Sequence, residues 1–148
     1  MIRKMAMFIV ACIGFTVMAQ AQIREIPTVV KDAFTAQYPD ADSIVYKDYL
    51  TTVSVYFRED GQKLMASYDS KGAWRQTEKE WNFDQLPQEV KDGFQKSKYA
   101  DWKVEEAYIL SLPAKVEQYR IKAAKNDIQK KYLYFNKSGR LVRDAITI

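Results

Sequence analysis

The sequence contains no histidine, and its single cysteine, Cys12, stands close to the beginning of the chain. Without histidine, the usual general base at neutral pH and the Ser-His and Cys-His nucleophile pairs are missing. The nitrogen and sulfur ligands of ordinary zinc, copper and iron sites are missing too. The five glycines form no phosphate-binding loop. We therefore expect no enzyme, no metal site and no cofactor.

Carboxylates offer the remaining candidates for chemistry. Glu105 and Glu106 are neighbours in a β-patterned segment, so we expect them on opposite sides, where they cannot form a glycosidase-like pair by themselves. Asp40 and Asp42, near Asp69 or Asp60, could supply oxygen ligands to Ca²⁺, but no loop has the EF-hand spacing. Capping of turns by aspartate is the commoner explanation for such residues.

The first residues have the pattern of a secretory signal peptide. Arg3 and Lys4 give a positive start, residues 5–18 are almost all apolar, and residues 19–21 (Ala-Gln-Ala) form a small-x-small cleavage site. The apolar run is short for a bilayer span, which needs roughly 20 residues. We expect cleavage of residues 1–21 after Ala21, a periplasmic or secreted location, and no transmembrane segment in the mature chain.

A second interpretation would anchor the chain through a lipid. Residues 9–12, Ile-Val-Ala-Cys, loosely resemble the signal for acylation, which would act on Cys12. However, the apolar stretch before Cys12 is very short, and residues 13–18 stay apolar where the tether of a lipoprotein is usually polar. Cleavage after Ala21 is the preferred interpretation.

One stretch of sequence occurs twice. Residues 26–34, IPTVVKDAF, return sixty positions later (86 − 26 = 60) as residues 86–94, LPQEVKDGF. In each copy the apolar residues recur with helical spacing, and the Lys-Asp pair falls on the opposite side. The proline fits the first helical position, where its missing N–H costs nothing. The pattern predicts helices over residues 27–37 and 87–96.

Short β-patterned segments follow each copy. They cover residues 43–49, 52–58, 62–68 and 73–79 in the first half, and residues 102–110, 115–123, 129–135 and 140–147 in the second. Short connections imply antiparallel neighbours. We predict an α+β fold: a tandem repeat of one helix plus four antiparallel strands, forming a single curved sheet of about eight strands with both helices on one face. The repeats are expected over residues 22–80 and 81–148, together one domain.

These features resemble the PepSY-like family of exported bacterial proteins. The resemblance rests on the signal peptide, on two "(I/L)P-x-x-V-K-D-(A/G)-F" helix starts and on two "D/N-x-x-G" hairpins, at residues 69–72 and 136–139. It implies the fold of β-lactamase-inhibitory proteins, in which tandem α/β repeats form a curved sheet backed by helices. The motifs are structural and the family has no settled biochemical role, so the resemblance says more about fold and export than about function.

Tyrosine is the most informative excess, with ten in the chain. Where apolar residues of a strand face the helices, the alternate residues point to the helix-free face of the sheet. Tyrosine, arginine and methionine there have the composition of interface hot spots, although surface tyrosines also stabilise cross-strand pairs without binding anything. The predicted partner-binding residues are Tyr56, Arg58, Met65, Arg120, Tyr132 and Tyr134.

We therefore predict an exported, non-enzymatic binding module that presents the helix-free face to a protein or peptide partner. Inhibition of a protease or another hydrolase is the specific form that the resemblance implies. The alternative is a small-molecule or ion sensor or carrier that binds a ligand between sheet and helices. Gly93 in place of Ala33 favours it, because a missing methyl group in the helix stripe would leave room.

Charge differs between the two halves. Residues 22–80 carry 8 Lys/Arg and 10 Asp/Glu (8 − 10 = −2), whereas residues 81–148 carry 13 and 9 (13 − 9 = +4). The second half could attract an acidic protein surface, an anionic glycan or a lipid headgroup, but a solvated basic face is the ordinary explanation. No nucleic-acid recognition motif is present.

Overall fold

The computed structural model describes residues 24–147; the predicted signal peptide, its cleavage site and Cys12 lie outside them. Both predicted helices and all eight predicted strands are present, with bounds that differ from prediction by no more than two residues. The elements are α1 (Thr28–Gln37), β1 (Asp42–Asp48), β2 (Thr52–Glu59), β3 (Gln62–Asp69), β4 (Trp74–Trp81), α2 (Gln88–Gln95), β5 (Lys103–Leu112), β6 (Val116–Ala124), β7 (Lys130–Asn136) and β8 (Leu141–Ile146), with short 3₁₀ turns at Phe83–Gln85 and Pro113–Lys115.

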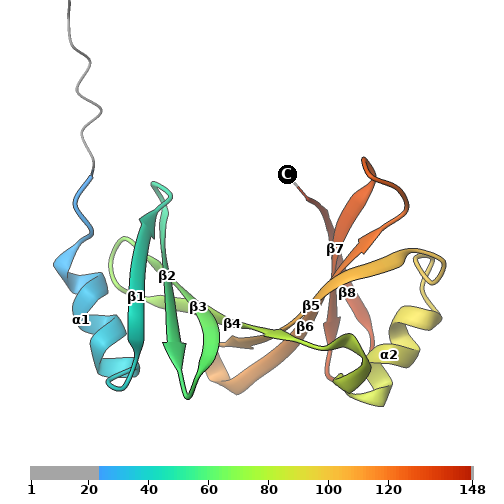
Figure 1. Ribbon diagram of the computed structural model, residues 1–148, viewed down its shortest axis with the longest axis horizontal. Helices are drawn as coiled ribbons and strands as arrows, with labels where there is room; N and C mark the ends of the chain where they lie inside the picture. The colour runs from blue at the N-terminus through green and yellow to red at the C-terminus, as the bar shows by residue number, and fades with distance from the viewer. Residues whose placement is uncertain (1–23, 148) are drawn as a thin grey trace, which may run out of the picture.

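The eight strands form one sheet in the order β1 to β8, each antiparallel to the next. Figure 1 shows the sheet bent, with β1–β2 and β7–β8 rising on either side of the central strands and both helices on the outer side. The helix-free face is therefore the inner, concave face. The predicted α+β fold with a single curved sheet is confirmed, whereas its division into tandem repeats remains an interpretation.

Each helix covers its own apolar cluster. Val30 and Phe34 of α1 are completely buried, and so is Val90 of α2, while Phe94 is 2% exposed. Burial of each such side chain contributes roughly 1.5–3 kcal/mol. Under α1 lie Val53, Val55, Phe57, Ala66 and Tyr68. Under α2 lie Ala107, Tyr119, Ile121, Leu133 and Phe135 among others. The two clusters lie at opposite ends of the sheet, so the packing of each helix is local.

The prediction that a proline occupies the first helical position is wrong for both helices. Pro27 and Pro87 are the N-caps, with extended ψ angles of 133° and 143°. The carbonyl oxygen of Pro27 accepts hydrogen bonds from the backbone N–H groups of Val30 and Lys31, at 3.0 and 3.3 Å. The fixed φ of proline suits both positions, and ψ decides between them.

The polar turns of the β3–β4 and β7–β8 hairpins each place a glycine against a helix. The Oδ1 atom of Asp69 accepts from two backbone N–H groups in residues 69–73, and Asn136 does the same in residues 136–140. Gly72 and Gly139 follow with φ of +83° and +77°. A β-carbon on Gly139 would lie 1.8 Å from the carbonyl oxygen of Glu89 on α2. The turn therefore approaches the helix backbone as closely as only glycine allows.

The space expected beside Gly93 is filled by protein. A β-carbon on Gly93 would lie 1.8 Å from the carbonyl oxygen of Gly139. The missing methyl group thus admits the β7–β8 turn, not a ligand. The expectation that Gly93 leaves room for a bound molecule is wrong, and the sensor or carrier hypothesis loses the residue that favoured it.

Candidate functional site

All six predicted partner-binding residues lie on the concave face. The registers between neighbouring strands put them in rows across the sheet, on the side opposite to the buried residues under α1 and α2. Residues that were not predicted to bind a partner share this face: Lys63, Glu78, Glu80, Glu106, Tyr108, Leu110, Lys122 and Arg143.

Arg120 and Glu78 form a two-point ion pair at the centre of the concave face. Both terminal nitrogens of Arg120 donate to the Glu78 carboxylate, at 2.7 and 2.5 Å. The side chains are only 13% and 8% exposed. Leu110 on β5 is directly opposite Glu78 and is 1% exposed. The Arg120–Glu78 ion pair therefore crosses an apolar side chain on the concave face. Burial, the largest single effect, would lower the pKa of Arg120, but the charge and hydrogen bonds of Glu78 together with Tyr134 outweigh it and the pKa is raised.

Two tyrosine rings flank the guanidinium of Arg120. Its central carbon lies 4.4 Å from the ring centre of Tyr108 and 4.7 Å from that of Tyr132. Arg143 lies 3.9 Å above the ring of Tyr134 on the neighbouring strand. Such cation–π contacts contribute roughly 0.5–2 kcal/mol each. The rings are thereby fixed in orientation on β5 and β7.

A β-bulge brings together two carboxylates that we expected to face opposite sides. The register of β5 shifts between Val104 and Glu106. As a result, the Nζ atom of Lys122 lies 2.6 Å from Glu106 and 3.6 Å from Glu105. Lys122 and then the Tyr108 hydroxyl, at 2.6 Å, lower the pKa of Glu106. The expected separation of Glu105 and Glu106 is wrong, but the pair is neutralised by lysine and resembles no catalytic dyad.

The predicted residues differ in accessibility. Tyr56 is 37% exposed and Arg58 is exposed, whereas Met65, Tyr132 and Tyr134 are partly buried. Arg120 is occupied by Glu78 and largely covered by the rings. A hollow of about 330 Å³, the central hollow, lies between Tyr56, Met65, Glu78, Tyr108 and Arg120, with further lining from Lys63, Leu64 and Glu80. The predicted residues from β2, β3 and β6 therefore line a common depression.

Sequence patterns missed the residues that order this face. Glu106 and Tyr108 alternate with Ala107 and Ile109 along β5, and this alternation could have placed them on the concave face. The contact between Arg120 and Glu78 joins residues 42 positions apart and had no signal in the sequence. The excess of lysine and arginine in residues 81–148 was also misleading as a sign of unpaired positive charge, because Lys122, Lys130 and Lys131 all have acidic partners.

Two of the aspartates considered as Ca²⁺ ligands, Asp69 and Asp42, already have hydrogen-bond partners within the chain. Asp69 caps its own hairpin, and hydrogen bonds from the Ala73 and Lys71 N–H groups, with Arg75, lower its pKa. Asp42 accepts a hydrogen bond from Ser43 at 2.7 Å. Residues 24–147 contain no cluster of three or more His, Cys, Asp or Glu side chains placed to hold a metal ion. Over the same residues, no helix is both long enough and apolar enough to span a membrane.

Solved structures with this fold come from several Bacteroides species. A DUF2874 family protein from Bacteroides ovatus has a TM-score of 0.73 and 22% identity, over 83% of this chain and 89% of that one. A BLIP-like protein from Bacteroides fragilis has a TM-score of 0.72 and 24% identity, over 85% and 89%. A chain described as "putative periplasmic proteins", from Bacteroides eggerthii, has a TM-score of 0.72 and 21% identity, over 83% of this chain and 90% of that one. These likenesses show the fold alone.

The search of curated proteins gave no match. Residues 51–143 match the family described as "Putative beta-lactamase-inhibitor-like, PepSY-like". The matched segment has 143 − 51 + 1 = 93 residues, more than half of the 148 in the chain. The chain belongs to the PepSY-like family.

Proposed function

We propose that this protein is a non-enzymatic binding module whose concave sheet face holds a protein or peptide partner. The observation that carries the proposal is the set of tyrosine rings that cations hold in place there: Tyr108 and Tyr132 around Arg120, and Tyr134 under Arg143. Rings that are already ordered lose little entropy on binding. Tyrosine, arginine and methionine are also the residue types enriched at binding hot spots and interfaces.

Within this face the predicted residues take different roles. Tyr56, Tyr132 and Tyr134 contact the partner through their rings, and Met65 adapts to it. Arg120 orders the rings and lines the central hollow, but its terminal nitrogens are already bound to Glu78 and do not donate to the partner. The partly open central hollow of about 330 Å³ receives one apolar or aromatic side chain of the partner.

Inhibition of a protease or another hydrolase is the specific form of binding that the family suggests. The family description contains the words "beta-lactamase-inhibitor-like", and one structural relative is called BLIP-like. A periplasmic or secreted location is supported by a relative described as a putative periplasmic protein and by the signal-peptide pattern of residues 1–21. In this setting the partner is another exported or envelope protein.

Site-specific photo-crosslinking in the native envelope fraction tests the proposal. A photoreactive amino acid at position 132 should crosslink a protein that the same amino acid at position 32, on the outer side of α1, does not. Changing Tyr108 to Ser should reduce the crosslink from position 132, because Tyr108 helps to shape the site. Equal crosslinking from both positions, or none from position 132, would show that the concave face does not bind a partner.

A further inference from the structure

Arg58 and Lys63 differ from the other cations near the middle of the concave face. Arg120 and Lys122 are paired with Glu78 and Glu106, and Arg143 lies on Tyr134. Among the residues that the structure describes, Arg58 and Lys63 form no ion pair, side-chain hydrogen bond or cation–π contact. No carboxylate of residues 24–147 therefore lies within ion-pair distance of either charge.

The β2–β3 hairpin forces these two charges together. Arg58 and Lys63 are direct cross-strand partners in a register that runs without a bulge from Thr52 to Glu59. The turn at Asp60 and Gly61, with φ of +50° and +74°, fixes that register. Directly opposite residues have β-carbons roughly 5 Å apart, and like charges at that distance are destabilising. An anion between the two side chains would remove the repulsion.

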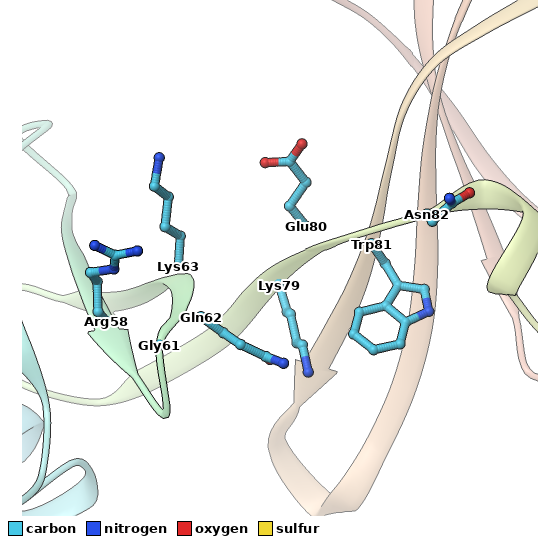
Figure 2. Close-up of a pocket in the computed structure, with 8 residues that line it drawn as sticks. All are labelled: Arg58, Gly61, Gln62, Lys63, Lys79, Glu80, Trp81 and Asn82. Carbon is cyan, nitrogen blue, oxygen red and sulfur yellow. The ribbon is translucent and has the colours of Figure 1, made fainter.

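Nearby carboxylates do not fill this role. Asp42, the partner of Arg58 on β1, accepts a hydrogen bond from Ser43 instead. Because Leu64 pairs with Lys79, the register places Glu80 next to Lys63, yet no ion pair forms between them. Figure 2 shows Arg58, Lys63 and Glu80 on one side of the sheet, and the side chains of Lys79 and Trp81 on the other.

An open hollow of about 580 Å³, the rim hollow, lies at these residues. On the concave side its charged lining is Arg58, Lys63 and Glu80, a net of 2 − 1 = +1, while Lys79 lines it from the other side of the sheet. Lys63 and Glu80 also line the central hollow, so the two depressions meet. A partner that fills the central hollow therefore passes directly beside the Arg58–Lys63 pair.

We propose that an acidic side chain of the partner binds between Arg58 and Lys63. The inference rests on the proposed function and specifies its partner: a protein or peptide with an Asp or Glu close to the residues that contact the tyrosines. A partner is favoured over a free small anion because an exposed charge pair contributes little by itself. Attachment to a segment already bound at the concave face raises the effective concentration of that carboxylate.

Peptides selected from a random library on the immobilised mature chain test this assignment. We expect the selected sequences to contain Asp or Glu, and replacement of that acid by Asn or Gln to weaken binding about three- to tenfold. The same replacement should have no effect on binding to the Arg58→Gln/Lys63→Gln variant. Lys137→Gln/Arg140→Gln removes one lysine and one arginine from the β7–β8 turn and is the matched control.

The possible failures are distinct. Suppose that binding requires Tyr132, but that replacing the acid of the peptide weakens binding equally to wild type and to Arg58→Gln/Lys63→Gln. Then the acid does not bind between Arg58 and Lys63, whereas the concave face remains the binding surface. If selected peptides bind Tyr132→Ser as tightly as wild type, or none is selected, the proposed function fails as well. If free glutamate or inorganic phosphate binds as tightly as the peptides and requires the pair, the pair is a small-anion site and the assignment is overturned.

A stability measurement tests the premise without any ligand. Arg58→Gln and Lys63→Gln, made singly and together, isolate the interaction between these two charges from their interactions with Asp42 and Glu80. If the two charges repel each other, the double variant should be less stable in urea than the sum of the two single effects predicts. Arg58→Gln combined with Lys137→Gln, in the other turn, should give additive effects. Additive effects of Arg58→Gln and Lys63→Gln would show that Arg58 and Lys63 do not repel each other, and the proposal would lose its basis.

Discussion

Arg120 on β6 reaches across β5 and donates two hydrogen bonds, of 2.7 and 2.5 Å, to the carboxylate of Glu78 on β4. The pair lies at the middle of the concave face, away from the two apolar clusters under α1 and α2. It also fixes the guanidinium against Tyr108 and Tyr132. The ion pair therefore links the stability of the sheet centre to the shape of the proposed binding site.

Removing only one partner of this pair should be costly. Arg120→Met leaves Glu78, whose side chain is only 8% exposed in the wild-type protein, without its cation. We expect a loss of about 2–4 kcal/mol, slightly less than for a fully buried pair. Urea denaturation measures it. The double variant Arg120→Met/Glu78→Leu should recover most of that loss, and a double variant as unstable as the single one would contradict this interpretation.

Gly93 and Ala33 give a matched pair of helix substitutions. Gly93→Ala should destabilise the protein by about 1–3 kcal/mol, although alanine is the better helix former, because the methyl group would overlap the Gly139 carbonyl. Ala33→Gly on α1 should cost only about 1 kcal/mol, from helix propensity. Thermal unfolding distinguishes the two, and a Gly93→Ala variant more stable than wild type would refute the contact with the turn.

Thr77 joins α1 to the sheet through one hydroxyl. This atom lies 2.5 Å from the Tyr38 hydroxyl and accepts from the indole N–H of Trp74 at 3.0 Å. Thr77→Val should therefore cost about 1–3 kcal/mol, because it leaves partly buried polar groups without a partner. Thr77→Ser keeps the hydroxyl and should cost less. Equal losses in urea unfolding would mean that only packing at this position matters.

Acid should weaken the Glu106–Lys122 pair before it affects the core. The folded pKa of Glu106 is lowered below its ordinary 4.5, so its stabilising contribution is present above pH 4.5 and is lost as pH falls through the folded pKa. The pKa of Lys122 is raised above 10.5, chiefly by its hydrogen bond to Glu106, so its contribution is lost as pH rises through that higher value.

Glu106→Gln tests this pH dependence. The urea midpoint of the variant should fall less steeply than that of wild type as pH drops from neutral through 4.5. Glu105, Asp69 and Asp144 also have lowered pKa values, so some acid sensitivity should remain in the variant. Asp101→Asn, which changes a carboxylate without an ion pair, should keep the wild-type slope; identical slopes in all three proteins would contradict the prediction.

Local patterns were sufficient to predict the fold. Helical spacing of Val30 and Phe34, and strand alternation around Val55 and Phe57, identified the elements and the buried faces, since each depends only on residues close in sequence. The Asp60-Gly61 pair between two β-patterned segments is also a local sequence signal for a hairpin turn, and both residues have positive φ. Short connections then allowed few arrangements other than a sequential antiparallel sheet.

The candidate site was only partly predictable because its contacts join distant residues. Alternation placed Tyr56, Tyr132 and Tyr134 on the correct face, but the partner of Arg120 depends on the order of β4, β5 and β6. The bulge at Glu105 has no local sequence signal, and it reversed the expected side of one carboxylate. Gly93 was misread for the same reason, because the group that fills its space is 46 residues away (139 − 93 = 46).

The binding face is tested most directly by the affinity of this protein for the partner that is crosslinked from position 132, measured as a dissociation constant. Tyr132→Ser should weaken binding by at least about tenfold, as expected for an ordered aromatic hot spot. Loss of the cation–π contact with Arg120 should lower the free energy of unfolding by only roughly 0.5–2 kcal/mol, so the variant should stay folded. Asp32→Ser, on the outer side of α1, should bind as wild type does. Unchanged affinity in Tyr132→Ser, or an equal loss in both variants, would contradict the assignment of the concave face as the binding surface.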